Sequence, residues 1–189
     1  MRIATVALLA AVVGVTPLAG QDSTATMNDV AMPRRISVDG HDLVLNGMAL
    51  RKKFIIKVYV AGLYLSERSK NAEAILASDA PRRIVLQFIY HPSANQMCGA
   101  WNESLEDNTP NASAELKQQF VTLCSYMEDV KKGETFVFTY LPGVGTEIAV
   151  RGKVKGTLPG KEFADALFKS WIGPKPGPGE DFKKKILGL

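Results

Sequence analysis

The feature that most constrains the fold is the run from Phe54 to Leu65, FIIKVYVAGLYL, in which Lys57 is the only charged residue. Successive side chains of a strand point to opposite faces, and in this run both faces are mostly apolar. A strand with one face in water would alternate apolar and polar residues, so the run predicts a strand that is covered on both sides. Lys57 and Tyr59 share one face, where they either reach a rim or line a cavity. For Lys57 we favour contact with solvent.

The rest of the chain predicts an antiparallel sheet with helices packed on it. Asp39-Gly40 suits a tight hairpin turn, and Asn46-Gly47 indicates a second turn before the long run. An apolar strand is expected at residues 82–91, and Gly-containing turns divide residues 133–160 into short strands. Helices are expected at residues 72–77, 92–107, 112–128, 161–173 and 180–189. Strands joined by tight turns, with helices grouped between them, predict an α+β domain.

The first twenty residues, MRIATVALLAAVVGVTPLAG, combine an early arginine with an apolar core, a proline and small residues. This pattern is typical of a secretory signal peptide, which is removed from the mature protein. The apolar core is short for a membrane span, and no later segment is long and apolar enough to be one, so we expect no transmembrane segment in the mature chain. The polar residues 21–35 are interpreted as a flexible leader. Residues 36–189 then form one domain.

The two cysteines, Cys98 and Cys124, fall on the helices expected at 92–107 and 112–128. If these helices form an antiparallel hairpin centred near residue 110, the two positions lie nearly level. A secreted chain permits oxidation, so the sequence predicts a disulfide that stabilises the fold by roughly 3 to 4 kcal/mol. The alternative is a pair of buried free thiols.

The composition argues against two classes of site. The net charge is +4, and the basic residues form short clusters at 51–53 and 183–185 without the interleaved aromatic residues of nucleic-acid grooves. The two histidines, His41 and His91, show no metal-ligand spacing with each other or with the cysteines. We therefore expect no nucleic acid, no metal and no cofactor.

Three separated segments carry a resemblance to a known family: GMALRKKFIIKVYVAGLYL, TYLPGVGTEIAVRGKVKGTLPG and LFKSWIGPKP. Together they resemble the chalcone isomerase-like family, in its secreted bacterial branch, over residues 36–188. The resemblance implies an open-faced β-sandwich, in which a large antiparallel sheet packs against helices and a cleft lies between a long strand and the helices. Plant members of that family cyclise chalcones to flavanones, whereas other members bind fatty acids.

The resemblance also implies three cleft residues. Arg51 resembles the family's cleft arginine, which polarises the substrate or holds a carboxylate. Tyr59 takes the place of a strand threonine, and Ser170 that of a threonine near the end of the last core helix. Each has a structural alternative: Arg51 as a solvated residue in a basic turn, Tyr59 as a sheet aromatic with its hydroxyl at a rim, and Ser170 bonded to a carbonyl of the preceding turn.

Two further donors of the plant enzymes, a tyrosine and an asparagine, are expected on the second helix of the hairpin. Their positions should fall near Glu115 and near Thr122 or Leu123, so neither original side chain is present. Each missing donor would cost roughly 2.7 to 4 kcal/mol of transition-state stabilisation. This argues against a plant-type reaction, and we expect no catalytic residues.

Three hypotheses follow. The leading one is non-catalytic binding of a small hydrophobic or fatty-acid-like ligand in the periplasm or outside the cell. The second is an isomerase, an intramolecular lyase acting on an enone. The third is an interaction protein whose cleft is filled by its own side chains.

Overall fold

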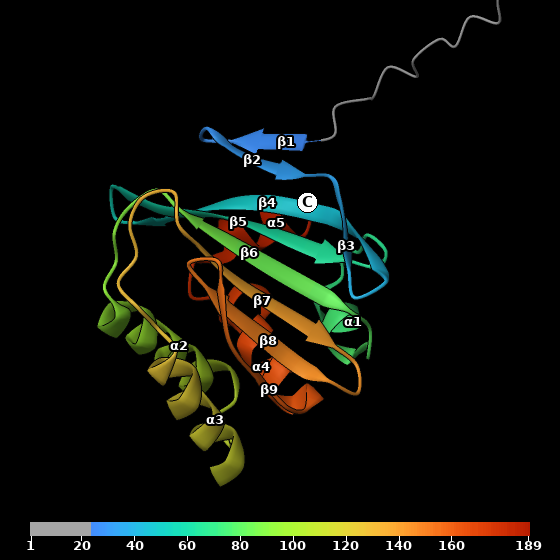
Figure 1. Cartoon of the computed structure of the whole chain (residues 1–189), viewed down its shortest axis with the longest axis vertical. Helices are drawn as coiled ribbons and strands as arrows, with labels where there is room; N and C mark the ends of the chain where they lie inside the picture. Colours follow the sequence, from blue (N-terminus) through green and yellow to red (C-terminus); the bar gives the residue numbers. More distant parts are fainter. Residues whose placement is uncertain (1–23) are drawn as a thin grey trace, which may run out of the picture.

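The computed structural model describes residues 24–189 and contains one large antiparallel sheet with helices on one face. The seven strands of this sheet lie side by side in chain order, so each pairs with the next along the sequence (Figure 1). They are β3 (Arg35–Val38), β4 (His41–Lys53), β5 (Ile56–Leu65), β6 (Arg82–Phe88), β7 (Thr135–Leu141), β8 (Gly145–Val150) and β9 (Lys153–Leu158). The predicted α+β class and antiparallel sheet are confirmed.

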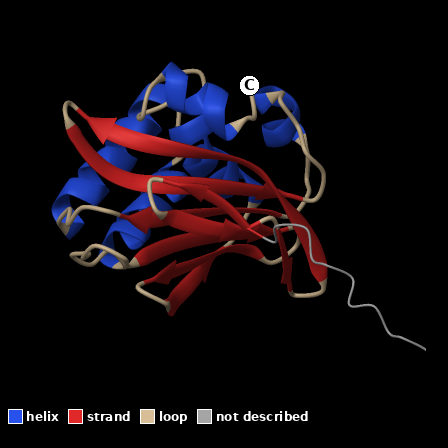
Figure 2. Cartoon of the chain, turned by 90° about the horizontal axis from the view of Figure 1, so that it is seen from above, coloured by secondary structure: helices blue, strands red, loops and turns tan. Residues whose placement is uncertain are grey.

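The helices gather on one face of the curved sheet (Figure 2). They are α1 (Ala72–Ala77), α2 (Ala94–Asn108), α3 (Ala114–Ser125), α4 (Lys161–Ile172) and α5 (Glu180–Ile186). The apolar stripes of α2, α3 and α4 pack with the sheet into the main hydrophobic core, in which Trp101, Phe120 and Trp171 are buried. The apolar residues of these helices recur three or four positions apart, which is the spacing of an amphipathic helix that lies on a core.

β5 is covered on both sides, as its composition predicts. On one face, Tyr59, Ala61 and Leu63 enter the core under the helices. On the other face, Val60 and Tyr64 enter a second, smaller core. Between the latter two lies Gly62, where an added Cβ would approach the Met32 sulfur to 2.4 Å. The second core therefore presses a neighbouring segment directly onto the strand.

That neighbouring segment is a hairpin of β1 (Thr24–Met27) and β2 (Val30–Pro33), where the sequence analysis had placed a flexible leader. The prediction is wrong for these residues. Val30 and Met32 are buried against the sheet, and the Tyr64 hydroxyl donates a hydrogen bond to the Pro33 carbonyl over 2.9 Å. The alternating apolar residues of a four-residue strand are too few to stand out in a polar segment. The predicted signal peptide, residues 1–20, lies outside the described residues.

Two predicted turns have different outcomes. The turn at Asp39-Gly40 is present, and both residues have positive φ, 47° and 79°. The turn at Asn46-Gly47 is absent, because β4 continues through it with a bulge between Leu45 and Gly47. The Asn46 amide is used instead as a side-chain donor, over 3.1 Å to the Ile186 carbonyl at the end of α5.

The predicted long strand begins two residues late. Phe54 and Ile55 form the turn between β4 and β5, and Phe54 has a φ of 55°. A second bulge leaves Val58 unpaired between the Arg51–Tyr59 and Lys52–Lys57 pairs. The extra residue reverses the alternation, so Lys57 points away from the face of Tyr59 and donates over 3.0 Å to the Asn28 side chain of the β1–β2 turn. Lys57 is exposed to solvent, as we favoured from the sequence.

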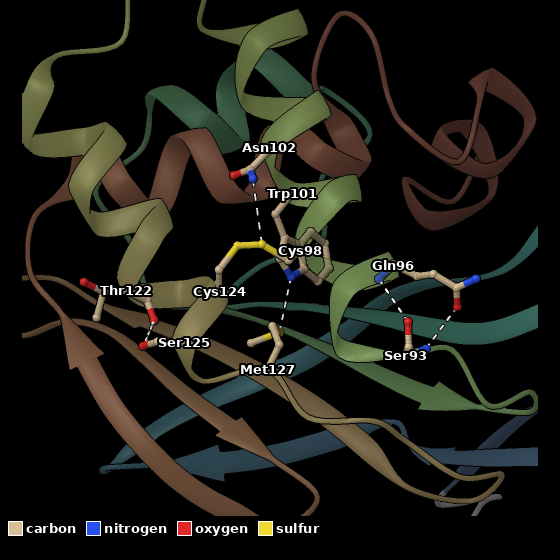
Figure 3. The surroundings of a disulfide bond; sticks show 9 residues. All are labelled: Ser93, Gln96, Cys98, Trp101, Asn102, Thr122, Cys124, Ser125 and Met127. Atoms are coloured by element: carbon tan, nitrogen blue, oxygen red, sulfur yellow. Dashed lines mark hydrogen bonds between the residues drawn. A yellow bond between two sulfur atoms is a disulfide. The ribbon is translucent and has the colours of Figure 1, made fainter.

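The predicted disulfide is present and joins α2 to α3. The Cα atoms of Cys98 and Cys124 lie 5.1 Å apart (Figure 3). One helical turn along, the Trp101 indole donates to the Met127 sulfur over 3.3 Å. Ser93 begins α2 with a capping box in which its side chain and that of Gln96 exchange hydrogen bonds with each other's backbone. These contacts hold α2 in place beside the sheet.

Candidate functional site

A cavity of about 780 Å³ opens between the β4–β5 hairpin, α2 and the end of α4. This volume falls within the usual range for small-molecule sites. The wall is mixed. Apolar side chains come from the strands and from α2 (Ile56, Val58, Met97, Ala100 and Trp101), and α2 also contributes the carboxylates of Glu103 and Asp107. An open cavity of this size does not fit the hypothesis of a cleft filled by the protein's own side chains.

Tyr59 and Trp171 form a hydrogen-bonded pair in the cavity wall. The Trp171 indole nitrogen donates to the Tyr59 hydroxyl oxygen over 3.0 Å, and both side chains are buried. Burial raises the pKa of the Tyr59 hydroxyl above its ordinary value, while the charge of Arg51 and the Trp171 hydrogen bond oppose this. Tyr59 therefore stays protonated near neutral pH, and its own proton is available to a further acceptor. The buried hydroxyl of Tyr59 lies in the cavity wall and not at an outer rim.

Arg51 faces Tyr59 across the β4–β5 ladder, since the two residues are register partners. Its side chain is half-buried and lines the cavity. Within residues 24–189, no carboxylate lies within ion-pair distance of its guanidinium. The Arg51 Nη1 atom lies 4.0 Å from the point where a Cβ on Gly177 would sit, so it is close to the chain that follows α4. Arg51 is a cation at a cavity wall, without an acidic partner in this part of the chain.

Ser170 and Ser104 add two buried hydroxyls to the same cavity. Ser170 comes from the last turn of α4 and Ser104 from α2, and each is 3% exposed. Neither hydroxyl has a hydrogen-bond partner in the described residues. The expected alternative for Ser170, a bond to a carbonyl of the preceding turn, is therefore not formed. A buried hydroxyl without a partner costs about 1 to 3 kcal/mol, so either atom would gain from a hydrogen bond to a water molecule or a ligand.

The segment after α4 is held across the cavity by Asn108, at the end of α2. The Asn108 amide donates to the Lys175 carbonyl over 2.9 Å and accepts from the Lys175 backbone nitrogen over 2.9 Å. The side chains of Asp107 and Lys175, which are both exposed and also line the cavity, form an ion pair at 3.2 Å. Residues 175–178, which also line the cavity, are therefore fixed to α2 by both backbone and charge contacts.

Other kinds of site find no support in the described part of the chain. Among residues 24–189, no group of three or more His, Cys, Asp or Glu side chains could hold a metal ion. Over the same residues, every helix is too short or too polar to cross a bilayer.

Comparison with known proteins agrees with this architecture. A model of the chalcone isomerase-like family matches residues 24–188. The chain belongs to the chalcone isomerase-like family. The match includes the β1–β2 hairpin, which sequence reasoning had left outside the domain. No curated protein sequence matches the chain.

A solved structure shares the fold over nearly its whole length. It is the crystal structure of a fatty-acid binding protein from Arabidopsis thaliana, with a TM-score of 0.69 and 18% sequence identity. The alignment covers 87% of this chain and 95% of that chain. At this identity the likeness concerns the chalcone isomerase-like fold alone.

The helix that lines the cavity is not the one that the family resemblance had implied. The resemblance placed the positions of the two missing plant donors on the second helix of the hairpin, near Glu115 and Thr122 or Leu123, but no residue of α3 lines the cavity. α2 faces it instead and contributes Trp101 and Ser104, which sequence reasoning missed. The side chains present at the α3 positions therefore do not decide the chemistry of the cleft. A signal for Ser104 was available, because it lies on the buried stripe of Trp101 and Leu105.

The structure thus brings Arg51, Tyr59 and Ser170, the three predicted residues, to one cavity of this chalcone isomerase-like domain. They come from β4, β5 and α4, which are far apart in the sequence. Together with Ser104 they offer a guanidinium and three hydroxyls beside the apolar part of the wall. This set of groups can hold a negatively charged or carbonyl oxygen next to a hydrocarbon chain.

Proposed function

We propose that the protein is a non-catalytic binding protein for a small hydrophobic acid, such as a fatty acid, and that it acts in the periplasm after removal of residues 1–20. One observation carries the proposal: Arg51, without an acidic partner in residues 24–189, lines a cavity of about 780 Å³ whose wall includes apolar side chains from β5 and α2. A guanidinium pairs with a carboxylate through two parallel hydrogen bonds. Each buried methylene of the acyl chain adds about 0.8 kcal/mol.

The other polar groups of the cavity fit the same ligand. The Tyr59 hydroxyl already accepts from Trp171, so it can donate to a carboxylate oxygen. The hydroxyls of Ser104 and Ser170 can donate as well, which would relieve their buried, unpaired state. The fatty-acid binding named for the Arabidopsis structure supports this ligand class through a shared fold.

One observation supports the alternative hypothesis of an isomerase that acts on an enone. Arg51, Tyr59 and Ser170 are donors around one cavity, and donors of this kind can stabilise the charge that develops on a ketone oxygen. Incubating the protein with a chalcone and following the loss of its absorbance separates the two proposals. The binding proposal expects no turnover above the uncatalysed rate.

The charge of Arg51 provides the direct test of binding. The Arg51→Ala variant should bind a fluorescent fatty acid roughly ten- to a hundredfold more weakly, because a hydrogen-bonded charge contact is worth about 1.5 to 3 kcal/mol. Displacement titration with palmitate measures the affinity, and native mass spectrometry of protein purified from cells shows whether an acyl ligand is carried.

Arg68→Ala is the matched control, since Arg68 is exposed and lies outside the cavity lining. It should bind as the wild type does. Equal affinity of the Arg51→Ala variant and the wild type would remove Arg51 from the site, and no binding of any fatty acid by the wild type would overturn the proposed ligand class.

A further inference from the structure

The tip of the β4–β5 hairpin exposes three consecutive large apolar side chains. Phe54 is 91% exposed, Ile55 95% and Ile56 41%. The other exposed large apolar residues of the described chain occur singly on separate elements. Single exposed apolar residues are ordinary, whereas a contiguous group indicates an interaction site. We call Phe54, Ile55 and Ile56 the apolar tip.

The backbone at the apolar tip is also unusual. Phe54 has a φ of 55°, in the left-handed region that glycine, asparagine and aspartate normally occupy. A bulky residue there costs conformational energy, and its side chain makes no compensating buried contact because it is almost fully exposed. An aromatic side chain in this place adds little buried area to the folded domain.

Four cations surround the apolar tip. Arg51, Lys52 and Lys53 precede it and Lys57 follows it, and no acidic residue interrupts residues 51–57. Lys52 and Lys57 are register partners across the hairpin, and both are exposed. Within residues 24–189, none of the four takes part in an ion pair. We call these four residues the cationic collar.

Two further lysines, Lys131 and Lys132, lie at the same end of the sheet, in a segment that also carries Glu128, Asp129 and Glu134. The Gly133 backbone nitrogen donates to the Phe88 carbonyl over 2.8 Å, and Phe88 pairs with Tyr59 close to where β5 begins. The exposed Lys131 and Lys132 just before Gly133 therefore lie beside the hairpin end of the sheet. Apolar side chains surrounded by cations match the layers of an anionic membrane, whose hydrocarbon lies beneath phosphate groups.

We propose that the apolar tip and the cationic collar dock the protein on an anionic lipid bilayer. Phe54 and Ile55 enter the interface between head groups and acyl chains, and the exposed Lys52, Lys53 and Lys57 of the collar contact the lipid phosphates. Docking by this surface does not require that the cavity hold a ligand.

The position of the apolar tip gives the docking a role. Phe54 and Ile56 line the cavity, together with Lys53 of the collar. A protein docked through the apolar tip therefore presents the cavity at the lipid surface. A hydrophobic ligand can then pass between bilayer and cavity with little exposure to water, which connects the docking to the proposed function.

Vesicle flotation tests the docking directly. Protein purified from cells in its processed form is mixed with vesicles of phosphatidylcholine alone or of phosphatidylcholine with phosphatidylglycerol. We expect binding to the anionic vesicles that weakens as salt is raised, because the collar's attraction is screened. The double variant Phe54→Ser with Ile55→Ser should bind at least about tenfold more weakly, since two apolar side chains are lost from the interface.

Two matched controls separate docking from general effects. The first is Val121→Ser with Val144→Ser, which removes two exposed apolar side chains from other elements and should bind as the wild type does. The second control compares two double variants. One combines Lys52→Glu and Lys57→Glu in the collar, and the other combines Arg68→Glu and Lys70→Glu, which follow the far end of β5. Only the collar variant should lose anionic binding.

Three results would overturn the inference. One is wild-type protein that floats with neither vesicle, and another is a tip variant that binds as well as the wild type. The third is tip-dependent self-association, or association with a protein, in the absence of any vesicle binding. Because the substituted side chains are exposed, a melting curve like that of the wild type is expected for every variant. Fatty-acid affinity, measured separately without vesicles, reports on the proposed function alone.

Discussion

Ser104 and Ser170 each bring a buried hydroxyl without a partner to the same cavity, and they illustrate what single residues decide here. A hydroxyl in such a place is unfavourable for the folded state alone, yet it becomes useful when a ligand supplies an acceptor. Arg51 follows the same logic, because a guanidinium at an apolar wall is stabilised by an incoming carboxylate. The ligand-free protein should therefore gain stability when these groups are removed.

Replacement of Ser104 by alanine tests this at the residue scale. Ser104→Ala should raise the free energy of unfolding of the ligand-free protein by about 1 kcal/mol, because an unsatisfied buried oxygen is removed from the middle of α2. The same variant should bind a fatty acid less tightly. Denaturant unfolding and displacement titration measure the two effects. A variant less stable than the wild type would mean that the hydroxyl has a partner in solution.

α2 is the element on which the cavity depends most. It carries part of the cavity wall on one face, and its Cys98 is joined to α3 through the disulfide. Its last residue, Asn108, fixes the segment after α4. The helix is attached by covalent, hydrogen-bond and packing contacts to three separate parts of the chain, so its position beside β5 is well defined.

The disulfide between α2 and α3 makes a prediction at the scale of elements. Cys98→Ser should lower the free energy of unfolding by roughly 3 to 4 kcal/mol under oxidising conditions, since the unfolded chain is no longer constrained by the cross-link. Melting curves with and without reductant measure it. Wild-type protein treated with reductant should melt like the variant, and identical melting of oxidised and reduced wild type would contradict the bond.

At the scale of the whole molecule, helices enclose one face of the sheet, and the β1–β2 hairpin encloses the β4–β5 part of the other face. The enclosure buries tyrosines that the unfolded chain would expose. Burial raises the pKa of Tyr64 to about 12, with Arg83 opposing the shift. Burial also raises the pKa of Tyr140 to about 12, and Asp79 adds to the effect.

These shifts predict alkaline unfolding. An unfolded tyrosine ionises near pH 10, whereas Tyr64 and Tyr140 in the folded protein hold their protons up to about 12. Between pH 10 and pH 12 the folded state therefore binds more protons than the unfolded state. The contribution of these two tyrosines to the free energy of unfolding is constant below pH 10 and falls as the pH rises towards 12. Denaturant unfolding across this range measures the slope. Tyr64→Phe should make the slope shallower, and an unchanged slope would exclude Tyr64 as a contributor.

Local patterns of residues were enough to predict several strands, helices and contacts. The apolar run ending at Leu65 predicted a strand covered on both faces. The positions of Cys98 and Cys124 on two consecutive expected helices predicted a disulfide across a helical hairpin. Arg51, Tyr59 and Ser170 could be named before the fold was known, although only through a family resemblance. Periodicity reports which faces are apolar, and that information is contained in neighbouring residues.

The tertiary structure alone decided what covers those faces. A bulge at Val58 turned Lys57 away from the face of Tyr59, and a bulge at Asn46 replaced an expected turn. Packing, and not local pattern, placed α2 rather than α3 at the cavity and laid a polar-looking hairpin over β5. One inserted residue reverses every later side chain of a strand, and burial depends on partners far away in the chain, so neither can be read from a local window of sequence.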